Sequence, residues 1–255
     1  MIQLTTSQTS ALRDWFVPDR PGPLVGLHIL QTGNGACFVD RWPNPRAVLV
    51  DSAGNYSLVG DPEALNPNDV KNRITGFVET PERFVPVLRA AFPNLNVWDR
   101  MIFELKTKSS FSISVEQLIR RLVPADAFHL WGLSPAINWI YNTWGGPAGL
   151  ATSGYAWGAF ADDWLVSVAC IFYVGERYEE IGVVTESEFR GLGLSAACAG
   201  KLCEDIQSRG RRPSWTTSPD NTASLRVAEK IGFSLQRRDF LYVIGTPIPE
   251  PARRQ

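Results

Sequence analysis

The sequence predicts a mixed α/β protein, and three observations support this fold class. Short strand-like runs separated by turn clusters fill much of the first half of the chain. In the second half, three strand-like runs are followed by a helix, a strand, a helix and a last strand, an order typical of mixed α/β domains. Hydrophobic residues make up 44% of the 255 residues and charged residues 20%, as in an ordinary globular protein with a substantial core.

Residues 1–123 are expected to form an N-terminal α/β domain. Its first runs are rich in apolar residues, and turn clusters containing Gly and Asn separate them, as in antiparallel hairpins. The expected strands are Leu24–Gln31, Cys37–Asp40, Ala47–Val50 and Tyr56–Val59. A helix is expected from Thr80, with Pro81 at its first position, although Pro86 falls where the middle of that helix would be.

The first domain should end with a strand over Val97–Leu105 and a helix over 114–122, which a capping box at Ser114 predicts. Pro124 marks the expected boundary. Beyond it we expect a second domain over residues 124–248 and a tail over 249–255.

The second domain should open with a helix that Ser134 caps and that the Gly145-Gly146-Pro147 run ends. Strand and helix signals then follow one another with short turns between them. The expected strands are Gly154–Phe160, Trp164–Tyr173, Glu180–Thr185, Ser214–Ser218 and Phe240–Ile244, and the expected helices are Leu192–Arg209 and Thr222–Ile231.

Charge and cysteine usage argue against several classes of partner. The net charge of −1 gives no general attraction to nucleic acid or to an anionic membrane, and no apolar run is long enough to span a bilayer. The start of the chain does not resemble a signal peptide. The cysteines and histidines are scattered, so we expect buried free thiols, no metal and a cytoplasmic protein. They are Cys37, Cys170, Cys198, Cys203, His28 and His129.

A loop between the strand at 180–185 and the following helix is the strongest candidate for ligand binding. Gly191 and Gly193 allow a close approach to backbone amides at the start of that helix, where unpaired N–H groups and the helix dipole attract phosphate. The candidate residues are Arg190, Gly191, Leu192, Gly193, Leu194 and Ser195. Glycines before a helix often serve only to turn the chain, so this pattern alone leaves both interpretations open.

The same loop resembles motif A of the GNAT superfamily of N-acetyltransferases, in which Arg190, Gly193 and Ser195 take the signature positions. Ser195 stands where Gly or Ala is usual. Downstream, Asn221 through Gly232-Phe233 resembles motif B of that superfamily. The resemblance covers about half of the chain. Glu180-Ile181-Gly182, Pro213-Ser214-Trp215 and the Asn221/Ser224 pair resemble a bacterial subgroup that includes zwittermicin-resistance acetyltransferases and carries an additional N-terminal region.

The resemblance implies a GNAT fold with a splayed mixed sheet and acetyl-CoA as the acyl donor. It implies that Val183, Val184 and Thr185 offer backbone groups to the pantetheine arm. Asn221 is either a helix cap or a pantetheine contact, and Ser224 either packs the helix or contacts the ligand. Residues 1–123 could then be a diverged GNAT-like half, and we expect no CoA binding there because no counterpart of the Arg190 loop is present.

For catalysis, an acceptor amine must lose a proton before it attacks the thioester. Glu180 is the first candidate for the general base, and Glu179 and Glu176 are alternatives. Alternation along a strand should turn Glu179 and Glu180 to opposite faces. Many GNAT enzymes have a tyrosine as general acid where this chain has Ala228. Either another residue replaces it, such as Tyr141, Tyr178 or Ser218, or the thiolate leaves without help.

These patterns predict an N-acetyltransferase that moves an acetyl group from acetyl-CoA to a primary amine, by direct attack. A small-molecule amine is the expected acceptor, and a protein amine is a variant of the same reading. The alternative is a non-catalytic CoA-binding protein of GNAT fold, which Ala228 favours. A dinucleotide-binding dehydrogenase fits poorly because an acidic residue is missing about 20 residues after the glycines. The patterns say nothing about the oligomeric state.

Overall fold

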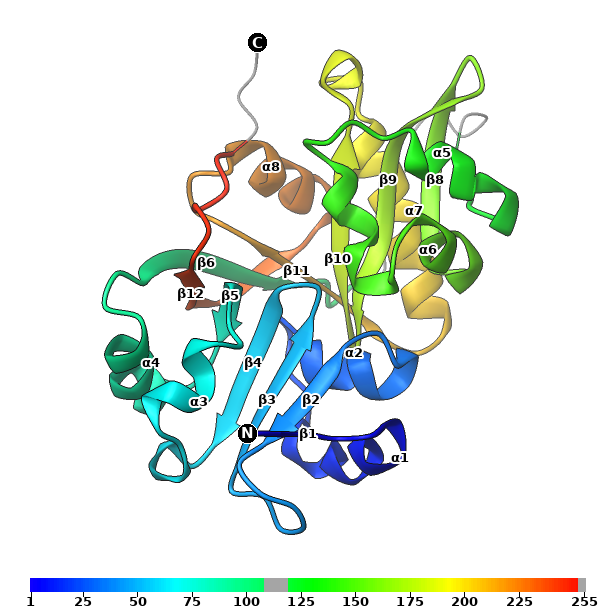
Figure 1. The fold of residues 1–255 in the computed structure, drawn as a ribbon. Coiled ribbons are helices and arrows are strands. Elements are labelled where there is room, and N and C mark those ends of the chain that lie inside the picture. The colour runs from blue at the N-terminus through cyan, green and yellow to red at the C-terminus, as the bar shows by residue number, and fades with distance from the viewer. Residues whose placement is uncertain (108–118, 252–255) are drawn as a thin grey trace.

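A twelve-stranded sheet is the framework of the protein, whose computed structural model describes residues 1–107 and 119–251. The sheet runs through both halves of the chain (Figure 1). Its strands are β1 (Ile2–Gln3), β2 (Ala36–Val39), β3 (Ala47–Ser52), β4 (Asn55–Gly60), β5 (Gly76–Glu79), β6 (Asn96–Glu104), β7 (Ile119–Arg121), β8 (Ala156–Ala161), β9 (Trp164–Val174), β10 (Tyr178–Thr185), β11 (Arg212–Thr217) and β12 (Ser234–Ile244).

The described α-helices are α1 (Thr6–Thr9), α2 (Val25–Thr32), α3 (Pro67–Lys71), α4 (Val85–Ala91), α5 (Ala127–Trp131), α6 (Pro147–Ser153), α7 (Leu194–Ser208) and α8 (Thr222–Ile231). The 3-10 segments that matter below are η3 (Glu82–Phe84) and η6 (Asn138–Trp144). Within the described residues, no helix combines the length and the apolar character that crossing a membrane requires.

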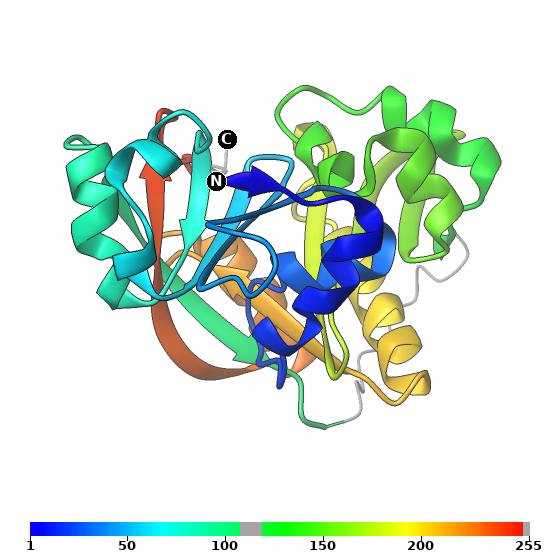
Figure 2. The ribbon, with the colours of Figure 1, turned by 60° about the horizontal axis from the view of Figure 1, so that its bottom comes forward.

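The two halves of the sheet mirror each other in strand order, which is β1-β2-β3-β4-β5-β12-β6-β11-β10-β9-β8-β7. Each half contains one parallel pair, β4 with β5 and β10 with β11, and the other neighbours are antiparallel. At the centre, β6 leaves the first half to pair with β11, while β12 returns from the second half to pair with β5. The two halves therefore share one topology, and they exchange a strand (Figure 2).

Helices pack on both halves of the sheet around three apolar clusters. The largest joins α7 and α8 to the strands β8–β11, a second joins α3 and α4 to β3–β5, and a third lies under α2. Helix α2 touches both halves: His28 Nε2 donates to the Thr143 carbonyl at 2.8 Å, and His28 Nδ1 accepts from the Val174 amide at 3.3 Å. All four cysteines are buried and free, as expected from the sequence.

Several predicted elements differ from those observed in the first half. The strand predicted over Leu24–Gln31 is wrong, because this segment is α2, which ends at Gly33 with φ 74°. Its first five residues are all buried, so no polar face reveals a helical period. The helix predicted from Thr80 begins later, since the chain forms η3 first and Pro86 then lies in the first turn of α4, where proline is tolerated.

Other differences lie near the middle of the chain. Most of the helix predicted over 114–122 falls on residues 108–118, which are outside the described residues, and its end is strand β7. The helix predicted after Ser134 is the 3-10 segment η6, which ends at Gly145 with φ 73°. The helices α5 and α6 were not predicted, whereas the strands β8 to β11 and the helices α7 and α8 were predicted to within a few residues, and β12 is longer than expected.

Candidate functional site

Strands β10 and β11 run in parallel but pair over only three residues. Tyr178, Glu179 and Glu180 pair with Arg212, Pro213 and Ser214, and the pairing stops there. Beyond this point β10 continues to pair with β9, and β11 continues to pair with β6. The sheet is thus splayed from Glu180 onward, and one edge of each strand has no strand beside it.

A register shift in the β9–β10 pair coincides with the splay. Glu180 pairs with Tyr173, whereas Ile181 pairs with Ile171, so Phe172 is an extra residue without a partner. Such a bulge raises the local twist and bends the strand. The bulge therefore gives a physical reason for β10 to part from β11 at this residue.

Hydrogen bonds at the strand ends show which backbone groups face the space between β10 and β11. The Glu186 amide donates to the Val166 carbonyl at 2.9 Å, so by alternation Gly182 and Val184 point toward β9. The groups of Ile181, Val183 and Thr185 then point into the splay. The sequence predicted backbone contacts from Val183, Val184 and Thr185. The backbone groups of Val184 point toward β9 and away from the space between β10 and β11.

The candidate phosphate loop lies where β10 leads into α7. Gly191 and Gly193 have φ values of 82° and 83°, a left-handed conformation that glycine adopts without strain. Gly193 precedes the first turn of the 15-residue helix α7, whose leading amides have no partner within the helix. The Arg190 Nε donates to the Thr185 carbonyl at 3.3 Å, and the Ser195 hydroxyl lies 2.7 Å from that of Thr185. Leu192 is exposed.

The two candidate residues at the start of α8 both have structural partners. Asn221 caps the helix, because its Oδ1 accepts from the Ser224 amide at 3.1 Å. The Ser224 hydroxyl accepts from the indole N–H of Trp215 at 2.9 Å. The Asn221 side-chain NH₂ is the group that a ligand could still use.

Of the three candidate carboxylates, only Glu180 is turned toward the side of the sheet that carries Tyr173. Glu179 is on the other face, where Arg209 and Arg211 pair with it at 2.5 and 2.7 Å. Glu176 lies in the turn before β10 and forms a bidentate ion pair with Arg13, with both distances at 2.7 Å.

Glu180 is a buried carboxyl without a full set of partners. Burial raises the pKa of Glu180 to about 7, and the nearby positive charge of Arg100 opposes part of this rise. The nearby Thr216 hydroxyl also lowers the pKa of Glu180. Even so, Thr216 Oγ1 and Glu180 Oε2 are both buried and neither has a hydrogen-bond partner. A carboxyl with this pKa can accept a proton near neutral pH.

The candidates for the general acid lie in different surroundings. Ala228, at the position of the usual tyrosine, is fully buried in the large apolar cluster. Tyr178 lies where β10 and β11 are still paired, Ser218 is buried just after β11, and Tyr141 packs against the large cluster.

Tyr173 was missed by the sequence reasoning. It lies opposite Glu180 on β9, and burial raises its pKa well above the usual value, so the phenol stays protonated. Arg100, on β6, was also missed. No local motif could reveal either residue, because their proximity to Glu180 depends on strand register.

No group of three or more His, Cys, Asp or Glu side chains in the described part of the chain is arranged to hold a metal ion.

The chain is similar to several known proteins. The sequence profile of the GNAT acetyltransferase family matches residues 24–242. An uncharacterized N-acetyltransferase in the mutA 5′ region of Streptomyces virginiae is 39% identical over 212 residues, which are 82% of this chain and 90% of that protein. A GCN5-related N-acetyltransferase-like protein from Streptococcus suis covers 94% of this chain and 99% of its own, at 17% identity and a TM-score of 0.69.

A tandem GNAT protein from the clavulanic acid biosynthesis pathway has a similar structure. It covers 97% of this chain and 99% of its own, at 12% identity and a TM-score of 0.55. At these identities the structural likenesses concern the fold.

Proposed function

The chain belongs to the GNAT acetyltransferase family, and we propose that it transfers the acetyl group of acetyl-CoA to a primary amine of a small molecule. The observation that carries this proposal is the continuity of three features along β10. The carboxyl of Glu180 lies where β10 and β11 separate, unpaired backbone follows, and the Arg190 loop opens α7 at the far end.

In this proposal the CoA molecule lies along β10. Its pyrophosphate binds the amides of the loop from Gly191 to Ser195, with Arg190 beside it as a positive charge. Its pantetheine arm pairs with the outward-facing groups of Val183 and Ile181, in the manner of an added strand. The thioester then reaches the level of Glu180.

The reaction is the attack of the amine nitrogen on the thioester carbonyl. Glu180 accepts a proton from the amine, directly or through water, and a C–N bond forms as the carbonyl becomes tetrahedral. The C–S bond then breaks, and the coenzyme thiolate takes up the proton that the attacking nitrogen loses as the amide forms. Tyr173, a protonated phenol opposite Glu180, is our candidate to position the acceptor or Glu180.

The burial of Glu180 supports a small acceptor. Glu180 is only 6% exposed, and on β9 its strand partner Tyr173 lies against Phe172, with 4.7 Å between the two ring centroids. A flexible small amine can enter such a site with less rearrangement than a side chain on a folded protein surface.

The test is release of free coenzyme thiol from acetyl-CoA in the presence of a panel of amines, with mass spectrometry of the acetylated product. Glu180→Gln is expected to lower kcat/KM by about 10²–10⁴ while leaving the affinity for CoA unchanged. Glu176→Gln is the matched control, because this glutamate lies four residues away and pairs with the exposed Arg13. Binding of acetyl-CoA without turnover across the whole panel would instead support a non-catalytic CoA-binding protein.

A further inference from the structure

A polar patch extends from Glu180 across the centre of the sheet. Ser214 pairs with Glu180, and Thr216 follows two residues later on the same face of β11. On the next strands, Thr216 is level with Ile102 of β6 and Ile102 with Arg237 of β12. The patch therefore contains residues from both halves of the chain, brought together by the exchange of β6 and β12.

The patch concentrates buried polar atoms that lack hydrogen-bond partners. Among the described residues eight such atoms occur, and five of them belong to this patch. The five are Glu180 Oε2, Ser214 Oγ, Thr216 Oγ1, Arg100 Nε and Arg237 Nη2. Buried polar groups are nearly always paired, so five open donors and acceptors together indicate a site that a polar ligand completes.

Arg100 is held so that part of its guanidinium is available beside the splay. Its Nη2 donates to the Thr216 carbonyl at 3.2 Å. Leu105 donates to the Pro213 carbonyl, so by alternation the Thr216 carbonyl points away from β6 toward β10. The guanidinium also stacks on Trp98, with 4.0 Å between the Arg100 Cζ and the ring centroid.

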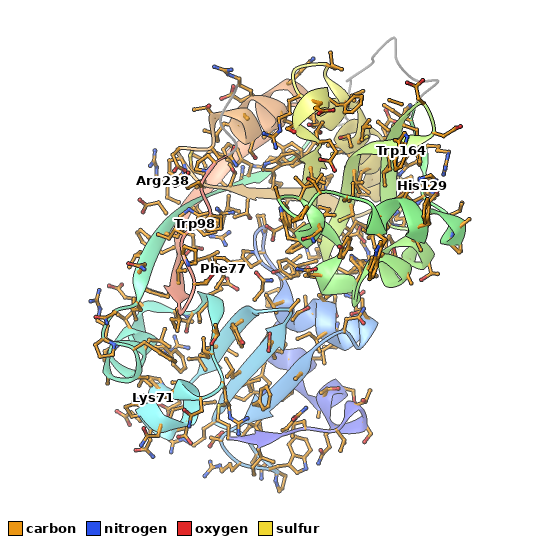
Figure 3. All side chains as sticks on the ribbon, turned by 45° about the horizontal axis from the view of Figure 1, so that its top comes forward. Lys71, Phe77, Trp98, His129, Trp164 and Arg238 are labelled. Carbon is orange, nitrogen blue, oxygen red and sulfur yellow. The ribbon has the colours of Figure 1, made fainter. Side chains whose placement is uncertain are left out.

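An aromatic wall continues from this stack. The rings of Trp98 and Phe77 have centroids 5.6 Å apart, and Figure 3 shows the two side chains close together near the middle of the molecule. Burial lowers the pKa of Arg100 to about 10, so its side chain remains cationic at neutral pH. Arg100 therefore places a fixed positive charge near the carboxyl of Glu180, whose Oε2 has no hydrogen-bond partner.

Arg237 supplies a second cation with one open donor. Its Nε donates to Asp239 at 3.0 Å and its Nη1 to the Pro21 carbonyl at 2.6 Å, which leaves Nη2 free. Gly22 packs against this nitrogen, because a Cβ at Gly22 would lie 2.9 Å from Nη2. Two nitrogens of the Arg237 guanidinium, Nε and Nη1, are thus fixed by hydrogen bonds, and the third, Nη2, has no hydrogen-bond partner.

We propose that the acceptor is a compact zwitterion that carries a carboxylate as well as the primary amine. The amine faces Glu180, and the carboxylate is bound by the open N–H groups of Arg100 and Arg237. This inference rests on the proposed function, because it assigns the substrate class of the same site. The ligand carboxylate would accept hydrogen bonds from the unpaired N–H groups of Arg100 and Arg237. The ligand amine would donate to the unpaired oxygen of Glu180.

The experiment compares matched acceptors with acetyl-CoA as donor. Each set contains an amino acid, its primary amide and the amine without the carboxyl group, and the sets differ in the separation of amine and carboxylate. For the best set, loss of the carboxylate is expected to lower kcat/KM about a hundredfold or more, because two buried cations lose their partner.

Arg100→Gln is expected to raise KM for the amino acid and to remove most of its advantage over the amide, with an unchanged affinity for acetyl-CoA. Arg238→Gln is the control, since Arg238 is an exposed arginine of the same strand as Arg237, paired with Met101 (Figure 3). Should Arg100→Gln fold poorly in thermal melts, Arg237→Gln serves the same purpose from another strand.

Calorimetric binding of the amino acids to the CoA-bound protein separates the two proposals. If amines without a carboxylate are acetylated as well as amino acids, the zwitterion inference is wrong and the acetyltransferase proposal stands. If amino acids bind in an Arg100-dependent way without turnover, the inference stands and the proposed function fails. If they neither bind nor react, the inference fails.

Discussion

Three glutamates lie within five residues of the chain, and their surroundings differ completely. Glu176 is paired with Arg13, Glu179 with Arg209 and Arg211, and Glu180 has an open carboxylate oxygen. The first two carboxylates are held in ion pairs with arginines, whereas burial raises the pKa of Glu180 to about 7. At the residue scale, the partner set distinguishes a candidate base from two structural ion pairs.

The pH dependence of the reaction should follow Glu180. Because burial raises its pKa to about 7, the carboxyl is protonated below this pH and cannot accept the proton of the amine. The rate, measured as kcat/KM, is therefore expected to rise with pH through about 7. In Glu180→Gln the residual rate should lose this inflection, and an inflection that persists in the variant would assign it to another group.

At the element scale, the start of α7 and the loop before it form one unit. Gly191 and Gly193 take left-handed φ values, and this turn directs the amides of the first helical turn outward. The loop was recognisable in the sequence because a strand, glycines and a helix with a regular apolar period follow one another within a short stretch. Binding of the proposed ligand, the pyrophosphate, depends on the local backbone more than on residues far away in the sequence.

Arg190→Ala combined with Gly193→Val tests this unit. Valine at φ 83° is strained, and the loss of Arg190 removes the local positive charge, so the affinity for acetyl-CoA is expected to fall at least about tenfold. Calorimetry measures the affinity, and a thermal melt checks the fold. Arg226→Ala, which removes an exposed cation from α8, is the control. An unchanged affinity in a folded double variant would place the pyrophosphate elsewhere.

Helix α8 provides a second prediction at this scale. Asn221→Ala removes the cap on the Ser224 amide and is expected to lower the free energy of unfolding by about 1 kcal/mol. Asn221→Asp keeps an acceptor oxygen and should retain most of the stability. Chemical denaturation measures both. A loss of CoA affinity in Asn221→Asp at full stability would reveal a pantetheine contact by the side-chain NH₂.

At the scale of the whole molecule, the exchange of β6 and β12 joins two halves of similar topology. Strand β6 is bounded by β11 and β12 of the second half, and β12 is bounded by β5 and β6 of the first. The boundary proposed at Pro124 divides the sequence, but each half of the sheet is completed by a strand from the other. Arg100 and Arg237 approach Glu180 only because of this exchange.

The fragments 1–123 and 124–255 are therefore expected to fold poorly when produced separately, since each lacks a strand of its own sheet and exposes an apolar edge. Co-expression should restore a folded complex. Circular dichroism and gel filtration of each fragment and of the mixture measure this. Two independently folded, monomeric fragments would contradict the expectation.

Much of the second half could be predicted from the sequence, whereas parts of the first half could not. The helix Thr222–Ile231 was predicted with its observed bounds, because an N-cap, a helical period and a terminal glycine all lie within the segment. The segment at Leu24–Gln31 was predicted wrongly, since a fully buried helix shows no polar face. The turn at Gly191 and Gly193 was found from local signals alone.

By itself, the sequence determined the order of elements in the second half, the glycine turn before α7 and the opposite facing of Glu179 and Glu180. These features depend on residues within one helix, strand or turn, where dihedral preferences, capping and alternation act over a few positions. Only the tertiary structure decided that β10 parts from β11 at Glu180, that β6 and β12 cross between the halves, and that Arg100 lies near Glu180. Such features depend on the register of strands far apart in the chain, which packing of the whole sheet selects.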